Sequence, residues 1–443
     1  MQNKPNITTS QILSLAIPAI FAGIAEPLIS LTDLAIIGQI PENSATSLAA
    51  VGTVGSFLSA IIWTIAQTKT SISSIVSRAL GAGELTKASV LIPQAIWLNI
   101  SLGLLIYVIT YFLAPTIFHF YTNEKPVLDI AVSYYKIRAF GFPFTLCAFA
   151  IFGIFRGIQN TSWAMIASLT GAAVNIILTY ILVLGSPFSE SYGIEGAAIA
   201  SVIAQATLLL VALFFLYKKT SYRITLPDFN NLYLLKKHVQ LTANFFLRTL
   251  AINVAIYLSY RYANNYGIEQ AATHAILMNI WLFFSFLIDG FANAGNALGG
   301  KLLGSKDPDS LLYLSKKTNG YGIAIALILA ILCGVAYPFL GHLFTDNSEV
   351  LKLLSITFWL VLVMQPINAV AFVYDGIFKG WGEASYLRNL LWILTGFVFI
   401  PVLLILDYFN LKLFAIWLAF FAWMLGRSVL LHLKFKQKIK ELL

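Results

Sequence analysis

The chain has 443 residues, of which 59% are hydrophobic and 11% are charged, and its formal net charge is +9 at pH 7. An ordinary soluble domain carries about 25% charged residues, so this composition excludes a soluble fold. A basic protein is a candidate for binding nucleic acid, but here the placement of the cations indicates a membrane topology, and we expect no nucleic-acid partner.

Apolar runs of about 20 residues recur along the whole length, and each is long enough to cross about 30 Å of hydrocarbon as a helix. Continuously apolar stretches such as 208–216 lack the alternation of a membrane β-barrel, so we predict an all-α membrane protein in the lipid bilayer. The twelve expected transmembrane helices lie near residues 12–38, 45–72, 91–114, 131–152, 158–184, 194–217, 238–262, 270–297, 318–340, 352–374, 386–406 and 411–432.

The first predicted helix carries two carboxylates, Glu26 and Asp33, in an otherwise apolar span. Each costs about 2.5–3.5 kcal/mol on insertion scales, so both side chains should point away from lipid. Their spacing is close to two helical turns, which places them on one face. We favour Asp33 as a residue that exchanges a proton or cation, although a carboxylate fixed by a hydrogen bond or a basic partner is the alternative. For Glu26 both interpretations stay open.

The fifth predicted helix carries Asn175 and Thr179, which are four residues apart and therefore share a face. This pair is suited to holding a proton, water or cation against the first helix. Interhelical packing by hydrogen bonds, worth about 0.6 kcal/mol each in membrane bundles, explains the same residues equally well.

A polar stretch at 218–237, with Pro227 and Asp228 near its middle, follows the sixth predicted helix. It divides the chain into an N-terminal six-helix lobe at 1–217, a cytoplasmic linker at 218–237 and a C-terminal six-helix lobe at 238–443.

Three charged residues of the C-terminal half are expected to be buried or semi-buried: Arg248 on the seventh predicted helix, Asp289 on the eighth, and Asp375 at the end of the tenth. Lone charges inside a membrane are rarer than paired ones, so a structural pair between Arg248 and either Asp289 or Asp375 is our preferred interpretation.

The positive charges lie mostly on one side of the predicted topology, and the positive-inside rule makes that side cytoplasmic. Both termini are then cytoplasmic, and we expect a multi-pass protein of the plasma (inner) membrane. The cations assigned to the inner loops and tails are Lys4, Arg78, Lys87, Arg156, Lys218, Lys219, Arg223, Lys236, Lys237, Lys301, Lys306, Lys316, Lys317, Lys379, Arg388, Arg427, Lys434, Lys436, Lys438 and Lys440.

The sequence repeats itself with a shift of 223 residues, without a gap from Arg78 to Gly157. This register aligns Pro143 with Pro366, and it places Gly153-Ile-Phe-Arg-Gly157 over Gly376-Ile-Phe-Lys-Gly380. Because each unit has an even number of helices, the two bundles should be parallel repeats around a cleft. Such duplicated folds place substrate sites near the membrane midplane, so the repeat favours transport.

Signatures of other chemistry are weak. The segment from Gly295 to Lys301 satisfies GxxxxGK, but Leu302 follows where a P-loop needs Ser or Thr. The histidines show no metal-ligand spacing, and no catalytic order of residues stands out. We expect no cofactor, no metal and no enzyme activity.

Several motifs together resemble the MATE family of multidrug and toxic compound extrusion transporters over nearly the whole chain. They are Pro18 with Leu-Thr-Asp33-Leu-Ala-Ile-Ile-Gly38, and Arg78-Ala-Leu-Gly-Ala-Gly-Glu84. Within that family, Asn244-Phe-Phe-Leu-Arg248-Thr, Asp289-Gly-Phe-Ala-Asn293 and Asp375-Gly-Ile-Phe-Lys-Gly380 are similar to the DinF branch.

The resemblance implies a secondary antiporter that exports small amphipathic organic compounds, often cations or drugs, in exchange for protons or sodium ions. It implies that Asp33 is the protonation site, that helix 1 bends at Pro18, and that Asn175 belongs to the same polar network. Thr179 departs from relatives that carry a second acid there, and Glu26 is a candidate substitute.

Sodium-coupled members of the NorM branch use acids on helices 7 and 10, whereas this chain has Arg248 and Asn368 in those regions. We therefore expect proton coupling, and a monomer. The alternatives are a sodium-coupled or organic-acid (citrate-like) exporter of the same fold, a lipid-linked precursor flippase and, less favoured, a membrane-embedded enzyme.

Overall fold

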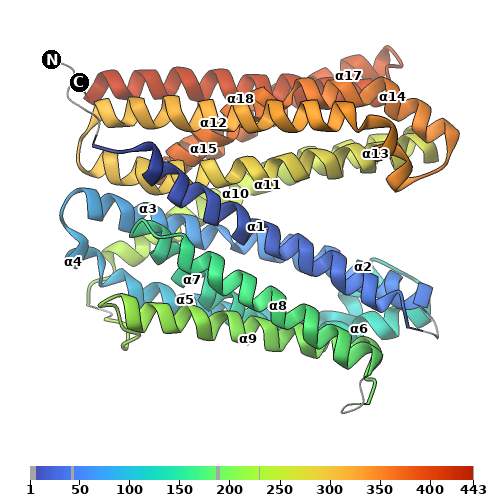
Figure 1. The fold of residues 1–443 in the computed structure, drawn as a ribbon, viewed down its shortest axis with the longest axis horizontal. Helices are drawn as coiled ribbons and strands as arrows, with labels where there is room; N and C mark the ends of the chain where they lie inside the picture. Colours follow the sequence, from blue (N-terminus) through green and yellow to red (C-terminus); the bar gives the residue numbers. More distant parts are fainter. Residues whose placement is uncertain (1–5, 41–43, 186–189, 229, 443) are drawn as a thin grey trace. The chain divides into compact units, whose positions relative to one another are not determined.

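The structure of the protein is a computed structural model that describes residues 6–40, 44–185, 190–228 and 230–442, without the side chains of residues 26, 44, 45 and 338. The described residues form helices and connecting turns and no strands, which confirms the predicted all-α fold. In chain order the helices (Figure 1) are α1 (Thr9–Ile37), α2 (Ser44–Ile65), α3 (Gln67–Gly81), α4 (Leu85–Ala88), α5 (Leu91–His119), α6 (Lys125–Ala139), α7 (Phe142–Gly157), α8 (Ser162–Leu184), α9 (Gly193–Lys219), α10 (Tyr233–Tyr266), α11 (Ile268–Gly304), α12 (Pro308–Val335), α13 (Tyr337–Phe344), α14 (Ser348–Val363), α15 (Gln365–Trp381), α16 (Ala384–Leu394), the π-helical turn η1 (Thr395–Phe399), α17 (Ile400–Tyr408) and α18 (Leu413–Leu442).

Within these described residues, 10 helical segments are long and apolar enough to cross a membrane, and two bent helix pairs raise the number to 12. This agrees with the expected twelve spans. The helices extend past the apolar segments seen in the sequence, because polar residues continue the helix beyond the hydrocarbon. One example is α10, which begins at Tyr233 and shortens the expected 218–237 linker.

Two spans expected to be continuous are broken in the structure. The pair α6 and α7 bends by 46°, and the pair α14 and α15 bends by 44°. Pro143 and Pro366 are the second residues of α7 and α15. Proline lacks the backbone N–H of a helix interior and restricts the residue before it, so each break has a local cause.

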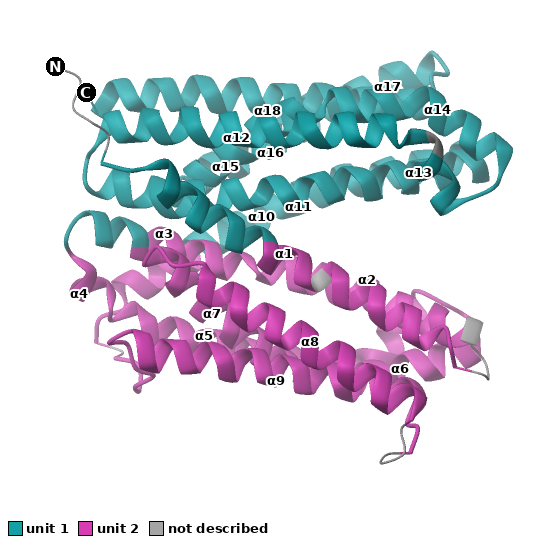
Figure 2. Ribbon diagram, viewed as in Figure 1, with its two compact units in different colours: residues 1–20, 77–83, 240–443 teal, residues 21–76, 84–239 magenta. Residues whose placement is uncertain are grey.

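The chain divides into two compact units (Figure 2). Unit 1 contains residues 1–20, 77–83 and 240–443, and unit 2 contains residues 21–76 and 84–239. Helix α1 therefore contributes its first part to unit 1 and the rest to unit 2. The boundaries expected for the two six-helix lobes, at 217 and 238, stay a prediction about the repeats.

In unit 2, α8 packs along α9, and α5 contacts α6 and α7. An aromatic cluster of Phe57, Phe118 and Tyr135 fills part of its core, with ring centroids 5.0–5.7 Å apart. The glycines of the repeated motif allow close packing here: a methyl group on Gly153 would lie 2.7 Å from the backbone oxygen of Lys69.

In unit 1, α15 packs against α11, α12 and α18. The second copy of the glycine motif lies at the closest of these contacts, because a methyl group on Gly376 would lie 2.1 Å from the backbone oxygen of Ala292. A methyl group on Gly380 would lie 2.2 Å from the backbone oxygen of Asn296. Each copy of the motif thus brings two helix backbones together within its own unit.

Candidate functional site

Asp33 is 4% exposed near the end of α1, in the part of this helix that belongs to unit 2. The Thr179 hydroxyl on α8 donates to Asp33 Oδ1 over 3.0 Å. One turn earlier on α8, Asn175 Nδ2 donates to the Ser201 hydroxyl on α9 over 3.0 Å. Because Ser201 in turn hydrogen-bonds to Asp33, the three predicted residues Asp33, Asn175 and Thr179 belong to one buried network.

Ser201 and Arg138 belong to this network, although the sequence did not single them out. The Ser201 hydroxyl also hydrogen-bonds to the Asp33 carboxylate, and the Arg138 guanidinium lies within its electrostatic range. Ser201 is one small residue in the Ala-rich α9, and Arg138 lies next to the last residue of α6. No local motif distinguishes either of them, because their role depends on which helices pack together.

Pro18 and Glu26, also on α1, are the other two predicted residues of the first helix. Pro18 is buried and lies inside α1, which is assigned as one helix from Thr9 to Ile37, so the bend implied by the family resemblance stays a prediction. The side chain of Glu26 lies outside the described residues, and its place in a network with Asp33 stays a prediction as well.

A cluster of buried charges around Asp375 lies in the C-terminal half, entirely within unit 1. Arg248 on α10 forms a two-pronged ion pair with Asp375 on α15, with Nε–Oδ1 and Nη2–Oδ2 distances of 3.0 and 2.6 Å. Both side chains are at least 94% buried. Of the two pairings expected for Arg248, the structure forms the one with Asp375.

Lys379 and Arg427 complete this cluster, which corrects their assignment to the cytoplasmic loops. Lys379 Nζ lies 2.8 Å from Asp375 Oδ2, and Arg427 Nη2 lies 3.4 Å from Asp375 Oδ1. Arg427 is 1% exposed, and its guanidinium carbon lies 5.4 Å from the ring centroids of Phe372 and of Trp423. Both cations are close to helix ends in the sequence, where hydropathy does not separate buried charges from exposed ones.

The remaining two candidates of the C-terminal half lie apart from the ion pair. Asp289 is exposed and accepts a hydrogen bond from Asn293 Nδ2 over 3.0 Å, within electrostatic range of Lys379. Asn368 is fully buried on α15 and donates to Gln365 Oε1 over 3.1 Å.

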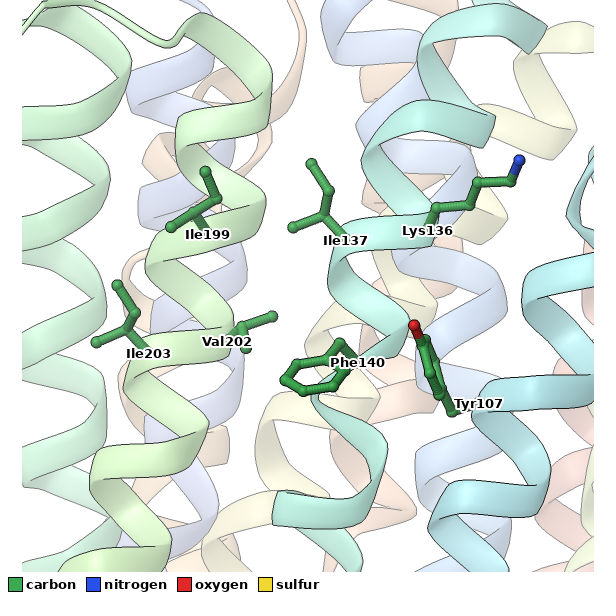
Figure 3. Close-up of a pocket in the computed structure, with 7 residues that line it drawn as sticks. All are labelled: Tyr107, Lys136, Ile137, Phe140, Ile199, Val202 and Ile203. Atoms are coloured by element: carbon green, nitrogen blue, oxygen red, sulfur yellow. The ribbon is translucent and has the colours of Figure 1, made fainter.

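An open groove on unit 2 has a volume of about 310 Å³ (Figure 3). Apolar side chains of α6 and α9 line it together with Tyr107 and Lys136. None of its lining residues belongs to the Asp33 network. Among the described residues, no group of three His, Cys, Asp or Glu side chains is placed to hold a metal ion.

Comparison with known proteins assigns the family. A family model described as MatE matches residues 18–181 and, a second time, residues 246–408. The chain belongs to the MatE family. This confirms the resemblance drawn from the sequence motifs, and it places one family match in each half of the chain.

Relatives of this MatE chain come from bacteria and plants. It is 26% identical over 388 residues to DNA damage-inducible protein F of Escherichia coli (strain K12), covering 85% of this chain and 81% of the relative. It is 25% identical over 383 residues to multidrug resistance protein MdtK of Edwardsiella ictaluri (strain 93-146), covering 84% and 82%. Protein DETOXIFICATION 42 of Arabidopsis thaliana is 30% identical over 270 residues, and the match spans about half of that relative (60% and 50%).

Solved structures share the fold at low sequence identity. "Crystal structure of MATE in the bent conformation" matches with a TM-score of 0.89 and 21% identity, over 98% of this chain and 95% of the other. "Outward-facing conformation of a multidrug resistance MATE family transporter of the MOP superfamily" matches with a TM-score of 0.88 and 21% identity, over 98% and 96%. The fold of this MatE chain is therefore that of solved MATE transporters.

Proposed function

We propose that this MatE protein is a secondary active antiporter that exports amphipathic organic compounds in exchange for protons, with Asp33 as the protonation site. The observation that carries the proposal is the buried Asp33 carboxylate, whose described hydrogen-bond partners are hydroxyl groups. The names of relatives such as multidrug resistance protein MdtK support the transport of drug-like compounds.

The partners of Asp33 suit a carboxylate that changes its charge. A hydroxyl group donates to a carboxylate and can instead accept from a carboxylic acid, so Thr179 and Ser201 can serve both forms. Asp375 differs, because Arg248, Lys379 and Arg427 surround it with cations that hydrogen-bond only as donors. These partners favour proton exchange at Asp33 and a permanently charged Asp375.

In the proposed cycle, the outward-open protein releases its substrate as Asp33 gains a proton. The protein then turns inward, loses the proton to the cytoplasm and binds new substrate there. Coupling arises because the two conformations differ in their affinity for the proton and for the substrate. Asn175 orients Ser201 toward Asp33, so it supports the site without exchanging a proton.

The decisive experiment is transport in proteoliposomes with Asp33→Asn, which keeps the size and polarity of the side chain but removes the proton exchange. We expect efflux driven by a pH gradient to be lost. The matched control is Asp129→Asn, an exposed acid on α6 of the same unit, which should transport like the wild type. A folded Asp33→Asn protein that still exports under a pH gradient would contradict the proposal.

The same assay separates the alternatives. Efflux driven by a sodium gradient alone would indicate the sodium-coupled alternative, and export of citrate would indicate the organic-acid exporter. Flipping of a lipid-linked precursor would support the flippase, whereas turnover of a lipid without any gradient would support an enzyme. We further propose a monomer in the plasma membrane of its cell, with both termini in the cytoplasm.

A further inference from the structure

The groove on unit 2 is an apolar channel between α6 and α9. Ile137 and Phe140 of α6 lie opposite Ile199 and Val202 of α9 (Figure 3). Phe140 is 48% exposed and Ile203, at the same groove, is 41% exposed, so the groove opens at the surface of the protein. In a membrane protein such an open, apolar surface faces lipid chains.

The groove lies within one leaflet of the expected membrane. α9 begins at Gly193, and its lining residues Ile199 and Ile203 follow about 9–15 Å along the helix. Half of a bilayer, headgroups included, is about 20 Å thick. An acyl chain can therefore lie in the groove while its headgroup stays at the membrane surface.

Lys136 is the cation of this groove, and among the residues that the structure describes it forms no ion pair. Its Nζ lies 5.0 Å from the centroid of the Tyr111 ring. Tyr111 is one turn closer than the lining residue Tyr107 to the end of α5 at His119, so Lys136 extends toward the headgroups. A cation–π contact compensates a charge at membrane depth only in part, and Lys136 can still bind an anion.

A carboxylate lies at the same end of the groove. Glu195 is exposed on α9, one turn before the lining residue Ile199. Its Oε1 accepts a hydrogen bond from the Ser133 hydroxyl on α6 over 2.8 Å. Because Ser133 is one turn before Lys136, the acid and the cation flank one end of the groove without pairing with each other. Two separate, opposite charges match a zwitterionic headgroup.

We propose that this groove binds a zwitterionic aminophospholipid of the phosphatidylethanolamine class. Its phosphate binds Lys136, its ammonium donates to Glu195, and one acyl chain lies between Ile137 and Val202. Both headgroup contacts are charge-assisted hydrogen bonds. Lys136 repels a cationic export substrate, so the groove favours the lipid over such a compound. The site goes beyond the proposed transport function, because it binds without any gradient.

The test measures lipid binding to purified full-length protein in detergent by native mass spectrometry. The probes are phosphatidylethanolamine, phosphatidylglycerol and phosphatidylcholine with the same acyl chains. We expect saturable binding of phosphatidylethanolamine by the wild type, tighter than that of the other two lipids. Lys136→Gln should bind it roughly fivefold more weakly, the contribution of one basic residue at a membrane surface. Lys136→Arg keeps the charge and should bind like the wild type. So should the control Lys125→Gln, which removes an exposed cation at the start of the same α6.

Glu195→Gln gives a result that a purely cationic patch would not. It should weaken binding of phosphatidylethanolamine, whose ammonium loses its partner, and strengthen binding of phosphatidylglycerol, whose phosphate no longer meets a nearby negative charge. The control Glu124→Gln changes an exposed acid just before α6 and should alter neither affinity. Thermal midpoints without added lipid verify that each variant is folded.

Two results would overturn the inference. One is a wild-type affinity for phosphatidylethanolamine that does not exceed the affinities for phosphatidylglycerol and phosphatidylcholine, which would indicate general contact with the bilayer. The other is an unchanged affinity for phosphatidylethanolamine in both folded Lys136→Gln and Glu195→Gln.

Discussion

Asp33 and Asp375 are both almost completely buried, and the identity of their partners gives them different chemistry. The sequence was sufficient to select both residues, because a carboxylate in an apolar helix is conspicuous. It also placed Asn175 and Thr179 on one face of α8. It did not provide Ser201 or Arg138, since a serine among alanines and an arginine near a helix end are ordinary until the packing of α6 and α9 against α1 is known.

The hydrogen bond from Thr179 to Asp33 predicts a measurable effect of Thr179→Val, which keeps the shape but removes the hydroxyl. A bond of this kind is worth about 0.6 kcal/mol in a membrane bundle, which corresponds to roughly a threefold change. We expect proton-driven efflux to fall by about that factor, while Thr179→Ser stays near the wild type. Thr207→Val is the control, because the Thr207 hydroxyl donates to the Ile203 backbone within α9 and has no other hydrogen-bond partner among the residues that the structure describes. Unchanged efflux in Thr179→Val would show that the bond does not serve transport.

At the scale of the helices, the repeated Gly-Ile-Phe-Arg/Lys-Gly motif marks positions where two helix backbones approach closely. Its glycines lie at the contacts of α7 with α3 and of α15 with α11. Lys379 inside this motif was interpreted as a loop cation, but it belongs to the buried cluster around Asp375. The bends before Pro143 and Pro366 were also missed, because hydropathy does not respond to a break inside an apolar run.

Gly376→Ala should destabilise the protein, because the new methyl group meets the backbone of α11 instead of a movable side chain. Overpacking of this kind costs about 1–3 kcal/mol. Thermal unfolding in detergent measures the loss. In the control Gly320→Ala, on α12, the added methyl group meets nothing within 4 Å, so stability should stay the same or rise slightly.

Asp307 caps the first turn of α12 and links it to the segment before α1. It accepts hydrogen bonds from the Ser310 backbone over 2.9 Å and from Asn6 Nδ2 over 2.8 Å. Burial raises the pKa of the Asp307 carboxyl, but these hydrogen bonds outweigh burial and hold its pKa below the ordinary value. The charged form is therefore stabilised by folding.

Asp307→Ala should lower the free energy of unfolding by about 1 kcal/mol at neutral pH. A lowered pKa contributes stability above the unfolded value, about 3.9, and loses it as the pH falls through the folded value. The difference between wild type and Asp307→Ala should therefore be constant from pH 7 to 5 and shrink below about pH 4. Thermal midpoints across this range measure it, and Asp309→Ala, an exposed neighbour without a capping bond, should lose less.

For the whole molecule, the duplicated plan follows from the sequence, and the family model supports it by matching each half once. The compact units do not follow the halves, because residues 1–20 and 77–83 group with the C-terminal half. Such groupings depend on contacts between residues far apart in the chain, which hydropathy and an internal repeat do not encode.

The proposed orientation predicts which surface positions face the cytoplasm. In a protein with Cys147 and Cys333 replaced by alanine, we introduce one cysteine at Lys125 or at Lys440, both exposed. A membrane-impermeant maleimide should label Lys125→Cys in intact cells and Lys440→Cys only after permeabilisation. The reverse pattern would place both termini outside.

The two bent helix pairs also bear on how the duplicated fold evolved. With the shift of 223 residues, the first residues of α6 and α7, Lys125 and Phe142, fall on those of α14 and α15, Ser348 and Gln365. The end of α7 at Gly157 falls one residue before the end of α15 at Trp381. A shared break of nearly equal angle indicates that the ancestral six-helix unit was already bent before its gene was duplicated. In the same register Asp375 falls on Phe152, so the charge distinguishes one copy from the other. Both copies thus share the bend, whereas the carboxylate of the charged cluster is present in only the C-terminal copy.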